Sequence, residues 1–284
     1  MRFTSTVLIG SLLAALSVAA ADAPKPLRAL LITGGCCHDY AKQKDILKKG
    51  LEERAHVVVE FVHTDDKSTK PPLAILGNAD YAKGYDVVIH DECAADVSDP
   101  AVIAAVLAPH RAGLPGVNLH CAMHSYRVGN AGTKSKAGEE RSAWFDYLGL
   151  QSSGHGPQEP IELNFTVAQH PATAGFTNWT TIKEELYNNV QIFPTATPLV
   201  RGKQIIKKKT KNPDGTEKVT EQAVETVVAW ANEYGKARVF STTIGHNNAT
   251  VSDPRYLDFL TRGLLWSCGK LEQGYLRPAG GTGQ

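Results

Sequence analysis

The stretch LRALLITGG, residues 27–35, decides the fold class. Leu27 to Thr33 is a mostly apolar run with the length of a buried strand, and Gly34-Gly35 ends it. A helical pattern follows over residues 42–54, and residues 56–62 form a second strand pattern. Two strands joined through a helix form the repeating unit of a parallel sheet.

The same alternation continues along the chain. Further strands are predicted at residues 85–89, 116–119 and 237–243, and further helices at residues 99–108 and 256–266. Because such strands bury both faces, helices must cover the sheet on both sides. The sequence therefore predicts an α/β fold with three layers, α/β/α, around a mostly parallel, flavodoxin-like sheet.

The second half of the chain also contains an antiparallel pattern. Residues 161–167 alternate as a half-exposed strand does, and residues 197–230 carry lysine-rich runs around the turn signal Asn212-Pro213-Asp214-Gly215. This pattern predicts a β-hairpin insertion. Lys207-Lys208-Lys209 is interpreted as a solvated edge strand rather than a nucleic-acid patch. We expect residues 22–284 to form one domain with this insertion.

Residues 1–21 have the pattern of a signal peptide. Arg2 supplies a positive charge, an apolar run covers residues 7–20, and Ala19-Ala20-Ala21 offers small residues for cleavage. The run is shorter than the roughly 20 residues of a membrane helix, although a retained anchor is the alternative. Cleavage after Ala21 leaves 263 residues (284 − 21). We expect an exported protein, periplasmic or secreted, without stable membrane insertion after cleavage.

The charge balance argues against a nucleic-acid partner. Without Arg2 the chain has 29 basic residues (30 − 1) and 29 acidic residues. A net charge near zero gives no electrostatic reason to bind nucleic acid or an anionic membrane surface. The oligomeric state stays open.

Five cysteines offer several disulfide pairings. Export permits disulfides, but an odd count leaves at least one thiol unpaired or intermolecular. Cys36 and Cys37 are adjacent, and we expect that they do not bridge each other. The absence of a CxxC pair from the sequence argues against a structural zinc knuckle.

Four predicted strands run into a histidine. These are His38 after Gly34-Gly35, His90 before Asp91-Glu92, His120 after residues 116–119, and His246 after residues 237–243. Ligands of open parallel sheets bind outside the carboxyl ends of the strands, so these side chains can meet there. Gly34 and Gly35 permit close backbone approach to a ligand. A surface or merely hydrogen-bonded role is the alternative for each histidine taken alone.

His120 lies where a buried strand turns into the small residues Cys121-Ala122. This is the position of the nucleophile elbow in many α/β enzymes. An imidazole at this position can act as a general base, a general acid or a metal ligand. Cys121 is the competing nucleophile, but strand alternation predicts that its side chain points to the opposite face.

The chain resembles the trehalose-utilisation, or ThuA-like, family. The matching segments are residues 30–35 with His38, 85–88, 118–122, 170–175, 184–187, 234–240 with 242–246, and 262–266. This resemblance implies a class I glutamine amidotransferase-like fold without the catalytic thiol, and a role in sugar utilisation. It implies pocket roles for His38, His120, Glu185, Tyr187 and His246. Cys36-Cys37 and Asn118 depart from the family pattern, and His124 and His155 extend the candidate site.

Three functions follow as hypotheses. The first is an exported enzyme acting on a sugar or keto-sugar, such as a trehalose-like or 3-keto-glycoside substrate. Its catalytic residues would be His38, His120, Glu185 and His246; Tyr187, His90, Asp91, Glu92 and His124, with Gly34 and Gly35, would bind substrate. The second is a hydrolase that uses a divalent metal such as zinc, with His38, His120 and His246 as ligands. The third is a non-catalytic sugar-binding module.

Overall fold

The computed structural model describes residues 24–165, 169–271 and 274–277. The predicted signal peptide at residues 1–21 lies outside this part. The described strands form a nine-stranded sheet in the order β2-β1-β3-β4-β9-β8-β7-β5-β6. Strands β2, β1, β3, β4 and β9 pair in parallel, whereas β8, β7, β5 and β6 continue the same sheet in antiparallel pairings.

The parallel half has the predicted strands and helices with small changes in their bounds, and two short helices, residues 143–148 and 248–251, that were not predicted. Its strands are β1 (Leu27–Gly35), β2 (Val57–Thr64), β3 (Val87–Cys93), β4 (Gly116–Leu119) and β9 (Ala237–Thr242). Its helices are α1 (Tyr40–Arg54), α2 (Pro100–Arg111), α3 (Ala143–Leu148), α4 (Asn248–Val251) and α5 (Pro254–Ser267). The Asp99 side chain accepts a hydrogen bond from the Ala101 N–H and so caps α2, as Asp253 caps α5 at the Arg255 N–H.

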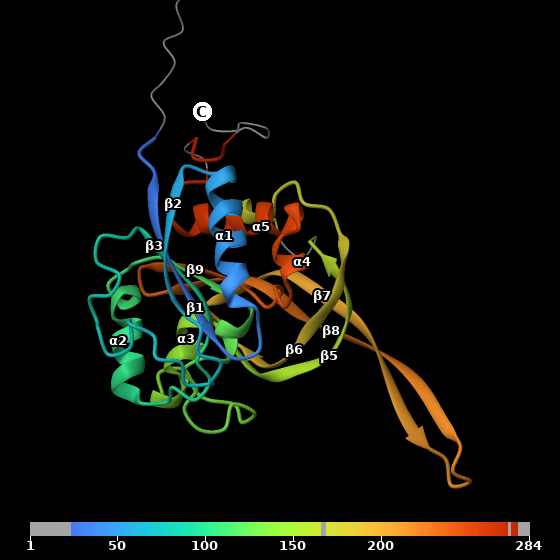
Figure 1. Cartoon of the computed structure of the whole chain (residues 1–284). Helices are drawn as coiled ribbons and strands as arrows, with labels where there is room; N and C mark the ends of the chain where they lie inside the picture. The colour runs from blue at the N-terminus through green and yellow to red at the C-terminus, as the bar shows by residue number, and fades with distance from the viewer. Residues whose placement is uncertain (1–23, 166–168, 272–273, 278–284) are drawn as a thin grey trace, which may run out of the picture.

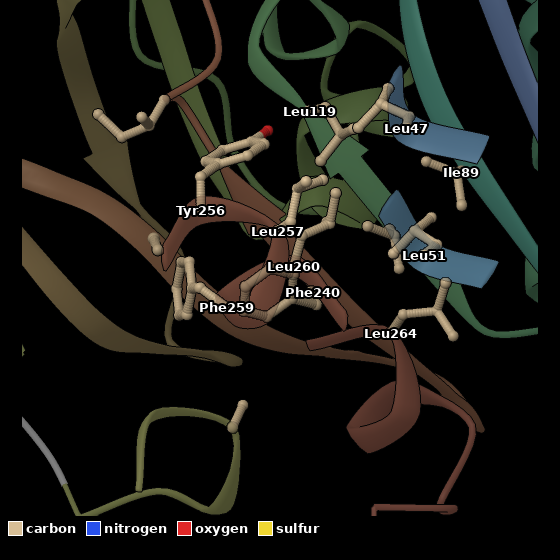
Figure 2. Packing of buried hydrophobic residues seen from close by; sticks show 14 of the residues in the cluster. Leu47, Leu51, Ile89, Leu119, Phe240, Tyr256, Leu257, Phe259, Leu260 and Leu264 are labelled. Atoms are coloured by element: carbon tan, nitrogen blue, oxygen red, sulfur yellow. The ribbon is translucent and has the colours of Figure 1, made fainter. Parts of the chain in front are cut away.

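Successive residues of β1 face opposite layers of the molecule. Ala29 and Leu31 belong to the core under α1 and α5, whereas Leu30 and Ile32 belong to the core under α2 and α3. Figure 2 shows the first of these cores, where Leu47 and Leu51 of α1 meet Leu257, Leu260 and Leu264 of α5. The alternation follows from the two-residue period of a strand. The predicted three-layer α/β/α arrangement is thus confirmed.

The antiparallel half is larger than the predicted insertion. The hairpin of β7 (Ala196–Lys211) and β8 (Glu217–Tyr234) is confirmed, and its tip projects far from the body (Figure 1). Two further long strands, β5 (Leu150–Asn164) and β6 (Trp179–Ile192), pair beside it. Register shifts interrupt the β5–β6 pairing. Residues 150–160 contain glycines and prolines, which are typical of such irregular strands and which hid β5 from the sequence analysis. No helix of the described residues is long and apolar enough to cross a membrane.

A buried polar network lies along β3 and α2. His90 contacts the Glu92 carboxylate through Nδ1 at 2.8 Å and the His110 ring through Nε2 at 3.1 Å. The Tyr126 hydroxyl donates to the same carboxylate at 2.6 Å, and His110 Nδ1 donates to the Leu114 carbonyl. His90, Glu92 and His110 are fully buried. Burial, followed by the proximity of His90, lowers the pKa of His110 to about 3.

We expect Leu51→Ala to lower the free energy of unfolding by about 2–5 kcal/mol, because it leaves a cavity between α1 and α5. Leu51 is fully buried, whereas Ile205 on the hairpin is 44% exposed. Ile205→Ala therefore serves as the control, with an expected loss below about 1 kcal/mol. Chemical denaturation measures both values. Equal losses in the two variants would contradict this assignment of the core.

The buried neutral His110 predicts a loss of stability in acid. Its folded-state pKa of about 3 lies below the usual histidine pKa of 6.5, so between these values only the unfolded chain binds the proton. Protonation of His110 in the unfolded chain has no effect on stability above about pH 7. At pH 5 it lowers the free energy of unfolding by about 2 kcal/mol. Denaturation of the wild type and His110→Gln at pH 5 and 7 measures it. The variant should lose about 2 kcal/mol less between the two pH values; parallel losses would refute the prediction.

Candidate functional site

Three of the four predicted strand-end histidines meet at one edge of the sheet. His38 follows β1, His120 follows β4 and His246 follows β9. The ring centroid of His38 lies 4.6 Å from that of His120 and 4.9 Å from that of His246. The ring centroids of His120 and His246 are 5.5 Å apart. The carboxyl ends of neighbouring parallel strands point the same way, which is why residues 208 positions apart come together.

His120 occupies a strained backbone position. Its φ of +40° lies in the left-handed region, which residues other than glycine rarely adopt. Its Nδ1 donates to the Thr243 carbonyl at 2.6 Å, so the strained turn is tied to the chain end of β9. A left-handed residue directly after a buried strand is the geometry of an elbow, and strain of this kind concentrates at functional sites.

The prediction that Cys121 points away from the site is wrong. Residues His120–His124 form a 3₁₀ turn, so the alternation of a strand ends at Leu119. The Cys121 Sγ lies 3.1 Å from His38 Nε2. Cys121 is nevertheless buried, and its pKa is raised well above the usual value by its hydrogen bond with Cys93 and by burial. A protonated thiol in this position is a poor nucleophile.

Backbone carbonyls orient the imidazoles of His38 and His120. His38 Nδ1 donates to the His246 carbonyl at 3.0 Å, as His120 Nδ1 does to Thr243. A carbonyl only accepts, so in each neutral ring the proton is on Nδ1 and the lone pair is on Nε2. Burial, with the nearby His120 and His246, lowers the pKa of His38 to about 3 and keeps this ring neutral.

The Glu185 carboxylate from β6 completes the cluster. One oxygen lies 3.4 Å from His120 Nε2 and the other lies 3.3 Å from His246 Nδ1. Burial alone would raise the pKa of Glu185, but its contacts with His120 and His246 outweigh burial and hold this pKa well below its usual range. The contact with Glu185 in turn raises the pKa of His246, against the opposing effect of burial.

Glu184, the neighbour of Glu185, is a positioning residue that the sequence analysis missed. Its side chain is fully buried and accepts the backbone N–H groups of Gly245 and His246, at 3.3 Å and 3.1 Å. The Gln43 side chain of α1 donates to the His246 carbonyl at 3.3 Å. These contacts hold the loop that presents His246. The sequence signal was the acidic pair itself, because two adjacent glutamates on a strand face opposite sides.

Tyr187 and His124 form an aromatic wall beside the cluster. Their rings stack at 4.3 Å, and the Tyr187 ring lies 5.1 Å from that of His120. His155, whose side chain is 43% exposed, lies 3.6 Å from the Glu185 carboxylate and marks the solvent side. The Gln158 amide donates to the same carboxylate at 3.2 Å, and Gln158 was not expected in the site.

The other predicted substrate-binding residues lie apart from the histidines. His90 and Glu92 belong to the buried network on β3 described above. Asp91 is also buried, and burial followed by the charge of Glu92 raises its pKa well above the usual value. Gly35 has a φ of +100°, and a Cβ there would meet the Cys93 carbonyl oxygen. Close packing against β3 thus explains this glycine without a ligand.

The expectation that Cys36 and Cys37 do not bridge is also wrong. The structure contains a Cys36–Cys37 disulfide, and their Cα atoms are 3.8 Å apart. Adjacent residues have a Cα–Cα separation below the usual range for disulfides, and this is why no bond was expected between them. Here Cys37 has a φ of +83°, so the backbone of the loop after β1 is left-handed at the second cysteine.

The histidine cluster fits a divalent cation. His38, His120 and His246 each offer a ligand atom, and these atoms lie within 4.8 Å of one another. His120 Nε2 and His246 Nδ1 are buried without a hydrogen-bond partner. Three histidines with an additional position for water form a common catalytic zinc site, and ligating imidazoles usually donate their second N–H to a carbonyl or carboxylate. Here three histidines converge, and His38 and His120 each donate their Nδ1 proton to a backbone carbonyl.

Comparisons with known proteins give similar folds and one matching family model. A structure described as a putative ThuA-like protein from Parabacteroides merdae is 21% identical, covers 88% of this chain and 92% of its own, and has a TM-score of 0.61. The cold-adapted β-galactosidase from Rahnella sp. R3 is similar in fold, with 11% identity, 86% and 31% coverage, and a TM-score of 0.52. A search of curated proteins finds no match. The family model ThuA, described as trehalose utilisation, matches residues 28–267, and the chain therefore belongs to the ThuA family.

Proposed function

We propose that the protein is an exported, metal-dependent enzyme that hydrolyses a bond in a sugar or keto-sugar, such as a trehalose-like or 3-keto-glycoside substrate. The observation that carries this proposal is the convergence of three imidazoles and one carboxylate at the carboxyl edge of the sheet. The sugar class is supported by the family, and export by the pattern of residues 1–21.

His38, His120 and His246 would hold the cation. A divalent cation such as zinc supplies Lewis acidity and lowers the pKa of bound water. Backbone carbonyls accept from Nδ1 of His38 and His120, which leaves Nε2 of each ring as the nitrogen that can bind a cation. The Glu185 carboxylate lies 3.4 Å from His120 Nε2 and 3.3 Å from His246 Nδ1, so a cation held by these nitrogens would lie next to a negative charge.

Glu185 would act as the general base. Its contacts keep the carboxylate ionised at neutral pH. The carboxylate oxygens lie 3.4 Å from His120 Nε2 and 3.3 Å from His246 Nδ1, close to where a water on the cation would lie. Tyr187 and His124 form an aromatic surface next to it, against which a sugar ring can pack. The exposed side of His155 leaves a route for substrate to reach Glu185.

A metal-free acid–base enzyme is the second candidate. The contact of Glu185 with His246 favours it, because the carboxylate raises the pKa of this imidazole and so stabilises its protonated form. In that case the imidazolium of His246 would donate a proton to the leaving group while Glu185 accepts one from water. The two candidates differ in whether turnover survives removal of the metal.

We expect the purified protein to bind one zinc ion, and His246→Ala to weaken binding by at least about 100-fold through loss of a ligand. Competition with a chromogenic chelator measures the affinity, and elemental analysis measures the stoichiometry. His170→Asn is the matched control, because His170 packs on Trp266 and its replacement can still accept the Ala172 N–H. Equal zinc affinity in His246→Ala and wild type would overturn the metal site, and turnover that persists without metal would favour acid–base catalysis.

We expect Glu185→Gln to lower kcat by about 10²–10⁴-fold, since the amide keeps the shape but cannot accept a proton. Turnover of trehalose and 3-keto-glucosides is measured by chromatography of the released sugars. Glu225→Gln, at a half-exposed ion pair on the hairpin, is the control and should leave kcat unchanged. Wild-type turnover in Glu185→Gln would refute the assignment, and sugar binding without turnover in the wild type would indicate a non-catalytic module.

A further inference from the structure

A cluster of sulfur atoms lies beside the histidines. The Sγ atoms of Cys36, Cys37 and Cys93 lie within 4.8 Å of one another, and those of Cys36 and Cys93 are 3.3 Å apart. Cys36 and Cys37 come from the loop after β1, and Cys93 is the last residue of β3. These three cysteines have no role in the site described above.

Strand pairing builds this cluster into the fold. Gly35 pairs with Cys93 in the parallel β1–β3 register, so the residue after Gly35 emerges beside the end of β3. A Cβ at Gly35 would lie against the Cys93 carbonyl group, and the glycine therefore permits the close approach of the two strand ends. The proximity of Cys36 to Cys93 is set by the sheet.

The cluster is separate from the histidine site but adjacent to it. Cys121 lies between them, since it packs with Cys93 and its Sγ lies 3.1 Å from His38 Nε2. Cys37 is exposed, Cys36 is half-buried and Cys93 is buried, so solvent reaches the disulfide from one side only. A small reductant or a metal ion can enter from that side.

We propose that reduction of the Cys36–Cys37 disulfide creates a three-thiolate site, formed by Cys36, Cys37 and Cys93, for a soft cation such as Cu(I). The reductant is a thiol or a phosphine: two thiols deliver two electrons and two protons to the disulfide and leave as their own disulfide. Binding of the cation then displaces the three thiol protons and forms three metal–sulfur bonds.

The donor set decides the class of cation. Three sulfur atoms, with no oxygen or nitrogen ligand among them, select a soft ion such as Cu(I) over Mg²⁺ or Ca²⁺. In the disulfide form Cys36 and Cys37 offer no thiolate, so the oxidised chain lacks the site. The site therefore responds to redox state, and it does not depend on whether the histidines bind a metal.

The test is an anaerobic titration of the full chain with Cu(I), after reduction with a phosphine that is then removed. The readouts are the ultraviolet thiolate-to-copper charge-transfer band and competition with a Cu(I) chelator. The reduced wild type should bind one Cu(I) with this band, and the oxidised wild type should not show the band. Cys37→Ser and Cys93→Ser should each lose the band and weaken binding by about 100-fold or more.

Two controls locate the site. Cys268→Ser alters a thiol outside the cluster and should keep the band, as should His246→Ala, which alters only the histidine cluster. Because Cys37 is exposed, Cys37→Ser tests the ligand set even where the buried Cys93→Ser fails to fold. Absence of the band from the reduced wild type, its retention in Cys37→Ser, or its loss in His246→Ala would each overturn the proposal.

Discussion

Parallel pairing of β1, β3, β4 and β9 is the constraint on which the site depends. Parallel strands end at the same edge, so every residue that follows a strand is delivered to one place. His38, His120 and His246 meet there, and so do Cys36 and Cys93. The helices on the two faces hold this arrangement by burying the alternating apolar residues of the strands.

The antiparallel half supplies the charge that this edge requires. Strand β6 brings two adjacent glutamates to the strand ends, and the two side chains contact different groups. Glu184 is buried against the backbone N–H groups of Gly245 and His246, whereas Glu185 faces the imidazoles of His120 and His246. A buried carboxylate is stable only with partners of this kind. The extra strands are therefore part of the site, in addition to extending the sheet.

The buried polar groups of the chain fall into two kinds. His90, Glu92, His110 and Tyr126 have hydrogen-bond partners in the core, and this network suits a structural role. His120 Nε2 and His246 Nδ1 are buried without such partners, although a carboxylate lies nearby. Other buried atoms of the described residues also lack a partner, Glu92 Oε2 among them, so the feature that sets the two histidines apart is their convergence on the Glu185 carboxylate. His90 lies in the middle of β3 and not at its end, whereas the three clustered histidines follow the ends of their strands.

The sequence by itself determined the layers, the parallel strands, the hairpin and the elbow position of His120. These features follow from local periodicity, turn residues and strand-to-helix order, which a chain expresses without long-range contacts. Only the tertiary structure decided that His90 leaves the cluster, that Cys121 joins its edge, that Cys36 bonds to Cys37, and that Glu184 holds the His246 loop. Those outcomes depend on strand register, on one 3₁₀ turn and on left-handed backbone at Cys37 and His120, which residue type and spacing alone do not specify.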